Sequence, residues 1–172
     1  MTRLMEQMRS GVRGKEIEEV AISPLLQEAA KNRLKSSPRA EIRSCDELMI
    51  AETDREQLLT VFTHMIQTAQ EATDKNGEIF IRAFRDGNES IVEVEDTGTG
   101  MSEDFIRNRL FKPFDSTKGL TGMGIGVFES REFIRSIGGD IRVLSKPGEG
   151  STFRISLPYR TKAVEPDQLH GE

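Results

Sequence analysis

An acid followed by two alternating glycines ends the apolar run at residues 90–96. The motif spans Asp96 to Gly100 and reads DTGTG. Glycine permits backbone angles and close approaches that other residues forbid. A carboxylate at the end of a strand can accept a hydrogen bond from an exocyclic amine, such as that of adenine. A strand-ending Asx turn explains the same acid without a ligand, so this motif alone leaves both interpretations open.

Three alternating glycines lead into a helical pattern further along the chain. Gly122, Gly124 and Gly126 alternate with Met123 and Ile125. Free N–H groups at a helix N-terminus bind phosphate. The absence of a following Gly-Lys-Ser/Thr excludes a Walker A loop, and the preceding loop, where a strand would be needed, excludes a Rossmann fingerprint. A flexible linker is the alternative, but linkers do not usually run directly into an amphipathic helix.

The segment between the two glycine motifs has the composition of a lid anchored at one end. Phe111 and Phe114 surround a proline, and small polar residues follow. The two phenylalanines would pin the base of this lid. Lys112 and Lys118 could meet phosphate as mobile cations, although an ordinary solvated charge explains each lysine equally well.

A long amphipathic pattern further upstream carries polar residues beside its apolar face. These are His64, Gln67, Thr68 and Glu71. Residues 64, 68 and 71 share one face at helical spacing. A polar stripe next to an apolar face suggests a lined cavity, and the solvent face of the helix is the alternative.

These motifs need elements that position them. Alternating apolar residues predict strands at 78–84 and 90–96, joined by a hairpin turn around Gly87. A capping box beginning at Thr53 predicts a helix from there to about Thr73. The other expected elements are helices at 24–35 (capped by Ser23), 102–110 (capped by Ser102) and 124–137, and strands at 40–44, 140–145 and 151–158.

Tight turns join several of these strands, so much of the sheet must be antiparallel. Apolar and polar residues alternate along these strands, which suggests a sheet with one face covered by helices and the other exposed to solvent. We therefore expect a two-layer α/β sandwich of the α+β type, with a mixed, mostly antiparallel sheet and helices on one face. This is not a Rossmann fold.

Length and composition limit the class of protein to which the chain can belong. The chain has 172 residues, one cysteine and a net charge of -5. The length suits one domain with a short extension, and the acidic balance argues against a nucleic-acid partner. A disulfide within the chain is impossible, which favours the cytoplasm. No apolar run reaches the roughly 20 residues of a membrane span, so no membrane contact by this chain is expected.

Four motifs in order resemble the catalytic domain of sensor histidine kinases. They are the 96–100 run, the segment from Phe111 to Phe114, the 122–126 glycines and GEGSTF at 148–153. They correspond to the first glycine box, the F box, the second glycine box and the closing strand motif of that family, which belongs to the Bergerat-fold ATPases. The resemblance covers about residues 50–158. It is nearest to kinases associated with exopolysaccharide export and to nitrogen-regulation-like sensors.

The resemblance implies roles for individual residues. Asp96 would bind the adenine amine, and Mg²⁺ would bridge the phosphate oxygens of ATP. Gly98 and Gly100 would let the chain pass beneath the base. The other residues expected to bind ATP are Met101, Lys112, Lys118, Gly122, Met123, Gly124, Ile125, Gly126 and Thr152.

The chain departs from the family pattern in the N box. Thr68 stands where the magnesium-binding Asn is expected, in the run HMIQTAQEA at 64–72. Mg²⁺ requires near-octahedral hard oxygen ligands. Three explanations are open: a water fills the gap with Thr68 behind it, metal binding is weak and the domain is impaired, or the threonine is an engineered change. His64 stands where related ATPases keep a general-base Glu, and could orient a water or contact the metal.

Kinase activity requires a phosphoacceptor histidine, and neither His64 nor His170 fits the expected context. We expect residues 1–15 to be the end of a phosphoacceptor hairpin, 16–160 the catalytic domain and 161–172 a disordered tail. The expected partners are ATP, a phosphoacceptor histidine domain and a response regulator. The fragment should be a monomer or weak dimer, and the full-length protein could be attached to the inner membrane.

Three functions follow from these motifs. The first is phosphoryl transfer from ATP to a histidine on a separate domain, for relay to a response regulator. The second is a nucleotide-binding regulatory module without catalysis, motivated by Thr68. The third is a serine kinase resembling anti-sigma factors. The helix and strand expected within 19–43 count against the third.

Overall fold

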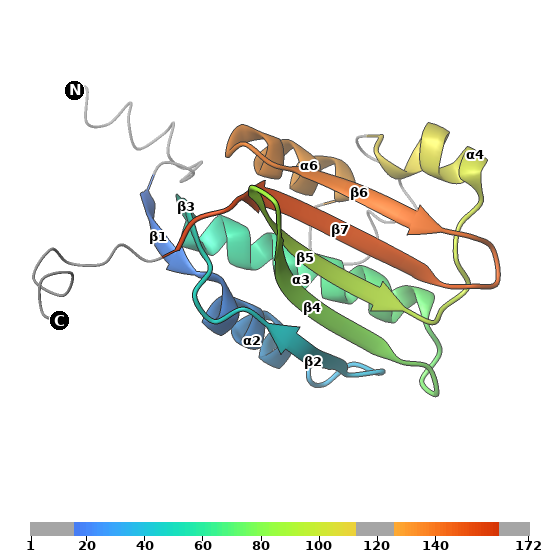
Figure 1. The fold of residues 1–172 in the computed structure, drawn as a ribbon. Helices are drawn as coiled ribbons and strands as arrows, with labels where there is room; N and C mark the ends of the chain where they lie inside the picture. Colours follow the sequence, from blue (N-terminus) through green and yellow to red (C-terminus); the bar gives the residue numbers. More distant parts are fainter. Residues whose placement is uncertain (1–15, 113–125, 162–172) are drawn as a thin grey trace, which may run out of the picture.

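A computed structural model describes residues 16–112 and 126–161 (Figure 1). A five-stranded sheet forms its main layer, in the order β2-β4-β5-β7-β6. Only β2 and β4 are parallel; the other neighbours are antiparallel. The strands are β2 (Ala40–Cys45), β4 (Ile79–Asp86), β5 (Glu89–Asp96), β6 (Asp140–Ser145) and β7 (Ser151–Pro158).

Helices cover one face of this sheet (Figure 1). They are α2 (Ile22–Asn32), α3 (Arg55–Ala72) and α6 (Val127–Ser136). Phe62 of α3 and Phe153 of β7 are among the largest fully buried side chains between the two layers. The expected two-layer α/β sandwich with a mixed, mostly antiparallel sheet is confirmed.

The opposite face of the sheet carries charged pairs. Glu93 of β5 accepts hydrogen bonds from Arg82 of β4 (3.2 Å) and Arg154 of β7 (2.9 Å). Arg82 also binds Glu95 at 2.7 Å. Because side chains alternate along the strands, apolar side chains pack against the helices and these ion pairs lie on the solvent-exposed face of the sheet.

A second, two-stranded sheet was not predicted. β1 (Ile17–Ala21) pairs antiparallel with β3 (Ile50–Asp54). Along β1 only Val20 is buried, so the segment has no alternation that marks a strand. Residues after β7 contact the start of β3, where the Ile50 N–H donates to the Arg160 carbonyl (3.0 Å) and Met49 forms an isolated bridge with Thr161. Contacts between distant segments, and not local pattern, create these strands.

The predicted capping box of α3 was wrong by one residue. The N-cap is Asp54, whose carboxylate accepts the Gln57 N–H at 3.0 Å. Thr53 is buried in β3, where it pairs with Glu18 of β1. Because β3 continues to Asp54, the helix cannot begin earlier.

The start of α2 also differs from the prediction. The helix begins at Ile22, before Ser23, and ends at Asn32. The Ile22 N–H donates to the Met49 carbonyl at 3.1 Å. A backbone partner from outside the helix thus replaces the side-chain cap that Ser23 was expected to supply.

Gln70 ties α3 to the segment after α2. Its amide nitrogen donates to the carbonyls of Arg33 (3.1 Å), Ser36 (3.3 Å) and Pro38 (3.0 Å). Its amide oxygen accepts from the Arg33 guanidinium (3.0 Å). A buried amide with four such contacts fixes where α3 lies relative to α2.

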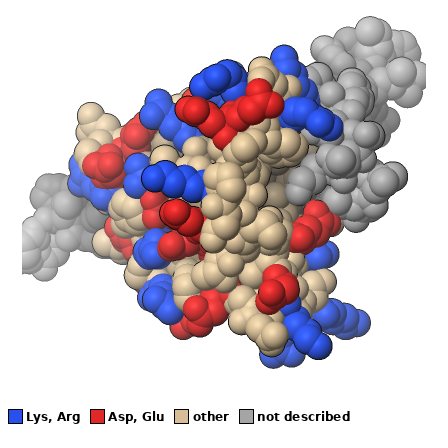
Figure 2. All heavy atoms as spheres, turned by 90° about the vertical axis from the view of Figure 1, so that its right-hand side faces the viewer, with Lys and Arg blue, Asp and Glu red and all other residues tan. Residues whose placement is uncertain are grey.

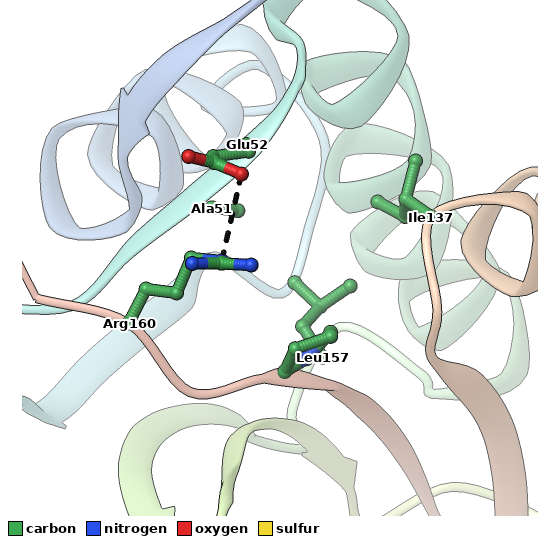
Figure 3. Close-up of a pocket in the computed structure, with 6 residues that line it drawn as sticks. Ala51, Glu52, Ile137, Leu157 and Arg160 are labelled. Atoms are coloured by element: carbon green, nitrogen blue, oxygen red, sulfur yellow. Dashed lines mark ion pairs between the residues drawn. The ribbon is translucent and has the colours of Figure 1, made fainter.

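A small hollow lies where the two sheets meet, at the end of β7 remote from Ser151 (Figure 3). Its lining includes Ala51, Ile137 and Leu157, and Glu52 and Arg160 form an ion pair there at 3.6 Å. Its volume of about 80 Å³ is far below the roughly 300 Å³ of the smallest usual ligand pockets. This hollow is therefore not a candidate for a nucleotide site.

Candidate active site at the end of β5

Asp96 ends β5 and is only 3% exposed. One carboxylate oxygen, Oδ1, accepts the N–H groups of Gly98 (2.8 Å) and Ser151 (3.3 Å). The other oxygen, Oδ2, is buried and makes no hydrogen bond to any residue that the structure describes. Buried carboxylate oxygens are normally satisfied, so Oδ2 is an acceptor that the described residues leave available.

The surroundings of Asp96 favour the protonated form of its carboxyl group. Burial raises the pKa of its carboxyl, and the N–H groups of Gly98 and Ser151 and the nearby Thr73 hydroxyl offset this only in part. The Thr73 hydroxyl is itself buried without a hydrogen bond among the described residues. Asp96 and Thr73 therefore present an acceptor and a hydroxyl at the same end of the sheet.

The glycines after Asp96 pack closely against backbone. A Cβ atom at Gly98 would lie 2.0 Å from the carbonyl oxygen of Ala72, the last residue of α3. Gly100 has φ +74°, and a Cβ there would lie 1.9 Å from the Lys146 carbonyl oxygen. The Thr99 N–H donates to the same Ala72 carbonyl at 3.0 Å. These glycines thus let the 97–100 loop lie against α3 on one side and the β6–β7 turn on the other.

The polar stripe of α3 is largely buried. His64, Gln67 and Thr68 are 1%, 3% and 4% exposed, whereas Glu71 is exposed. The Thr68 hydroxyl lies 3.5 Å from His64 Nε2. The solvent-face alternative therefore holds only for Glu71, and His64 and Thr68 lie together on the buried side of the helix.

The strand register brings Ser151, and not Thr152, to Asp96. Ser151 is the cross-strand partner of Asp96, while Thr152 pairs with Glu95. Successive side chains of a strand point to opposite faces. The Thr152 side chain therefore points to the exposed face of the sheet, and it lines a hollow of about 210 Å³ with Glu95 and Leu144 that Asp96 and Ser151 also border. The alternation of Ser151 with buried Phe153 was the sequence signal that identifies the inward-facing residue.

Ser145 is a further residue that the sequence reasoning missed. Its hydroxyl lies 2.7 Å from the Ser151 hydroxyl and donates to the Gly150 carbonyl at 2.9 Å. It also accepts the N–H of half-buried Met101 at 2.8 Å. Ser145 thereby joins the chain after Asp96 to β6 and β7.

The remaining predicted residues divide into two groups. Lys112 is described and exposed. Gly126 is the N-cap of α6, and its N–H donates to the Glu129 carboxylate at 2.8 Å. Its backbone is extended, so α6 begins at Val127. The residues that lie outside the described part of the chain are Phe114, Lys118, Gly122, Met123, Gly124 and Ile125.

Figure 2 faces the end of the sheet that carries Asp96. Acidic and basic side chains are interspersed there around an uncharged strip. Within residues 16–112 and 126–161, no group of three His, Cys, Asp or Glu side chains is arranged to hold a metal. Among the same residues, no helix has the length and apolarity needed to cross a membrane.

Known proteins share both the sequence and the fold. A family model described as "Histidine kinase-, DNA gyrase B-, and HSP90-like ATPase" matches residues 53–161. Sporulation kinase E of Bacillus subtilis is 38% identical over 111 residues, which are 63% of this chain and 15% of that protein. The chain spans about a sixth of the length of the curated relatives it matches.

Solved structures of histidine kinases have a similar fold. The catalytic domain of the histidine kinase ThkA has a TM-score of 0.72 at 25% identity, covering 83% of this chain and 95% of that one. Full-length ShkA in complex with AMPPNP also has a TM-score of 0.72 at 25% identity, covering 87% of this chain and 32% of that one.

Proposed function

The chain belongs to the family of histidine kinase-, DNA gyrase B- and HSP90-like ATPases, and we propose that it is the ATP-binding catalytic domain of a two-component sensor histidine kinase. The observation that carries this proposal is the buried Oδ2 of Asp96, which lies near the Thr73 hydroxyl and accepts no hydrogen bond that meets the geometric limits within the described residues. It lies at the end of β5, where the loop from 97 to 100 meets α3.

Asp96 recognises adenine in this proposal. Oδ1 is already held by two backbone N–H groups, so the carboxylate is fixed in orientation. Oδ2 then accepts a hydrogen bond from the exocyclic amine of adenine. The hydroxyls of Thr73 and Ser151 lie at the same end of the sheet and take the place first expected for Thr152.

The triphosphate would extend from there toward the N-terminus of α6. The positive end of that helix dipole favours anions, and the glycines from 122 to 126 would wrap the phosphates. Mg²⁺ binds mainly to phosphate oxygens and water in such sites, and Thr68 of α3 is the residue that would hold it from the protein side. The bound ion supplies neutralisation of charge on the transferred phosphoryl group.

Little covalent chemistry is required of the side chains, because positioning and charge neutralisation dominate phosphoryl transfer. We propose that the γ-phosphoryl passes to a histidine on a separate phosphoacceptor domain and then to a response-regulator aspartate. The similarity to named histidine kinases supports this role. The proposed compartment is the cytoplasm, where ATP and response regulators are available.

The test is phosphotransfer in trans. The chain is incubated with Mg-ATP labelled at the γ-phosphate and a purified helical hairpin from the same protein that carries the phosphoacceptor histidine. We expect acid-labile, alkali-stable phosphate on the hairpin. A folded chain that binds ATP but leaves the hairpin unlabelled would exclude the kinase role and leave a nucleotide-binding module.

The second candidate is that nucleotide-binding module without catalysis, and Thr68 is the reason to consider it. A neutral hydroxyl on a short side chain is a poorer magnesium ligand than the amide oxygen of Asn. We expect Thr68→Asn to tighten ATP binding about fivefold, which corresponds to roughly 1 kcal/mol, and only when magnesium is present.

Calorimetric titration of ATP with Mg²⁺ and with EDTA measures this effect. Thr60→Asn, at an exposed position of the same helix, is the matched control and should change nothing. If Thr68→Asn alters affinity equally with and without magnesium, residue 68 does not face the metal.

A further inference from the structure

One arginine of α6 joins three elements. The Arg131 guanidinium stacks on the Phe111 ring, 4.3 Å from its centroid. Its Nε also donates to Asp140 Oδ1 at 3.2 Å. The side chain is 26% exposed, so the contact is partly shielded from water, where cation–π attraction is stronger.

These contacts lie at both borders of the 113–125 segment. Phe111 follows the π-helical turn η1 (Ile106–Leu110), which continues the short helix α4 (Glu103–Phe105). Arg131 follows buried Val127, the first residue of α6, by four positions and shares its face. The stacking therefore fixes the N-terminal part of α6 relative to the end of η1.

Asp140 holds the arginine in this orientation. Burial by itself would raise the pKa of the Asp140 carboxyl, but hydrogen bonds from Arg135, the Ile141 N–H and Arg131 hold it below its usual value. The carboxylate is therefore ionised at neutral pH. Arg135 contacts the same oxygen at 3.0 Å, and within the described residues it stacks on no ring.

We propose that Arg131 is a positioning residue for the phosphate end of bound ATP. By stacking on Phe111 it sets the position of the α6 N-terminus, toward which the triphosphate would extend. Adenine is recognised by Asp96 on β5, which Arg131 does not contact. This inference rests on the proposed function, and it predicts that Arg131 affects ATP and not adenosine.

Arg131→Ala tests this, with Arg135→Ala as the matched control that loses an Asp140 contact but no stacking. ATP with Mg²⁺, and adenosine alone, are titrated against each variant. We expect Arg131→Ala to raise the Kd for ATP about five- to tenfold, the scale of a partly shielded cation–π contact, with adenosine unchanged. Arg135→Ala should leave both ligands within about twofold.

Two further variants separate positioning from stability. Arg131→Lys keeps the charge near Asp140 but lacks the planar group, and should lose part of the ATP affinity that Arg131→Ala loses. Phe111→Leu keeps Arg131 and Asp140 and should give the same ATP-specific loss. If Arg131→Ala weakened the binding of ATP and adenosine equally, or if Arg131→Ala and Arg135→Ala had equal effects, the inference about Arg131 would be wrong. The proposed function would not be affected. No ATP binding by the unchanged chain would overturn the proposed function as well.

Discussion

Asp96→Asn is expected to raise the Kd for ATP about 100-fold or more while the chain remains folded. Asn presents an amide group where the carboxylate offered two acceptor oxygens, so its NH₂ would face either the two backbone N–H groups or the adenine amine. Loss of a charge-assisted hydrogen bond together with a buried unsatisfied donor corresponds to about 3 kcal/mol, which is about 100-fold in affinity.

Stability should respond in the opposite direction to binding. Burial raises the pKa of Asp96, so the folded chain holds this proton more tightly than the unfolded chain. The free energy of unfolding therefore falls as pH rises through the pKa that Asp96 has in the folded chain. Below the pKa of Asp96 in the unfolded chain, this destabilisation is absent. Asn carries no charge, so Asp96→Asn should be at least as stable as the unchanged chain at pH 7, with the difference shrinking toward acidic pH.

Calorimetry for ATP and urea unfolding at several pH values measure both effects. Glu95→Gln is the matched control, because it removes the neighbouring acid from the opposite face of the sheet. It should leave ATP affinity unchanged within about twofold. An Asp96→Asn variant that binds ATP normally would show that Oδ2 does not contact the base.

Gly98→Ala is expected to lower the free energy of unfolding by about 3 kcal/mol, the upper part of the range for overpacked sites. The added Cβ would lie 2.0 Å from the Ala72 carbonyl oxygen. Backbone cannot rotate away as a side chain can, so the 97–100 loop must leave α3. Because Asp96 accepts the Gly98 N–H, ATP affinity should fall as well.

Urea unfolding with an exposed glycine as control checks this effect. Gly148 has φ +81°, and a Cβ added there would meet nothing within 4 Å. Gly148→Ala therefore reports only the cost of the left-handed backbone, roughly 1–2 kcal/mol. Gly98 lacks a positive φ, so its effect is steric. If Gly98→Ala were no worse than Gly148→Ala, the close approach to Ala72 would not matter for stability.

The local sequence pattern was enough to predict several helices and strands and to identify Asp96 as a candidate site residue. The hairpin of β4 and β5 and the Ser102 cap, whose hydroxyl accepts the Phe105 N–H at 3.1 Å, depend on neighbouring residues alone. Alternation and turn residues encode such features directly. Asp96 could be singled out for the same reason, because its place at the end of an apolar strand is visible in the sequence.

The choice between Ser151 and Thr152 depended on how β5 and β7 align, although Asp96 and Ser151 are 55 positions apart in the sequence. A shift of one residue exchanges every side chain between the two faces. Packing of β7 against the helices sets that alignment. The small sheet of β1 and β3 and the contact between Arg131 and Phe111 likewise join segments distant in sequence. The sequence by itself thus determined which residue types are available to bind ATP in the proposed site, and only tertiary packing determined which of them lie together.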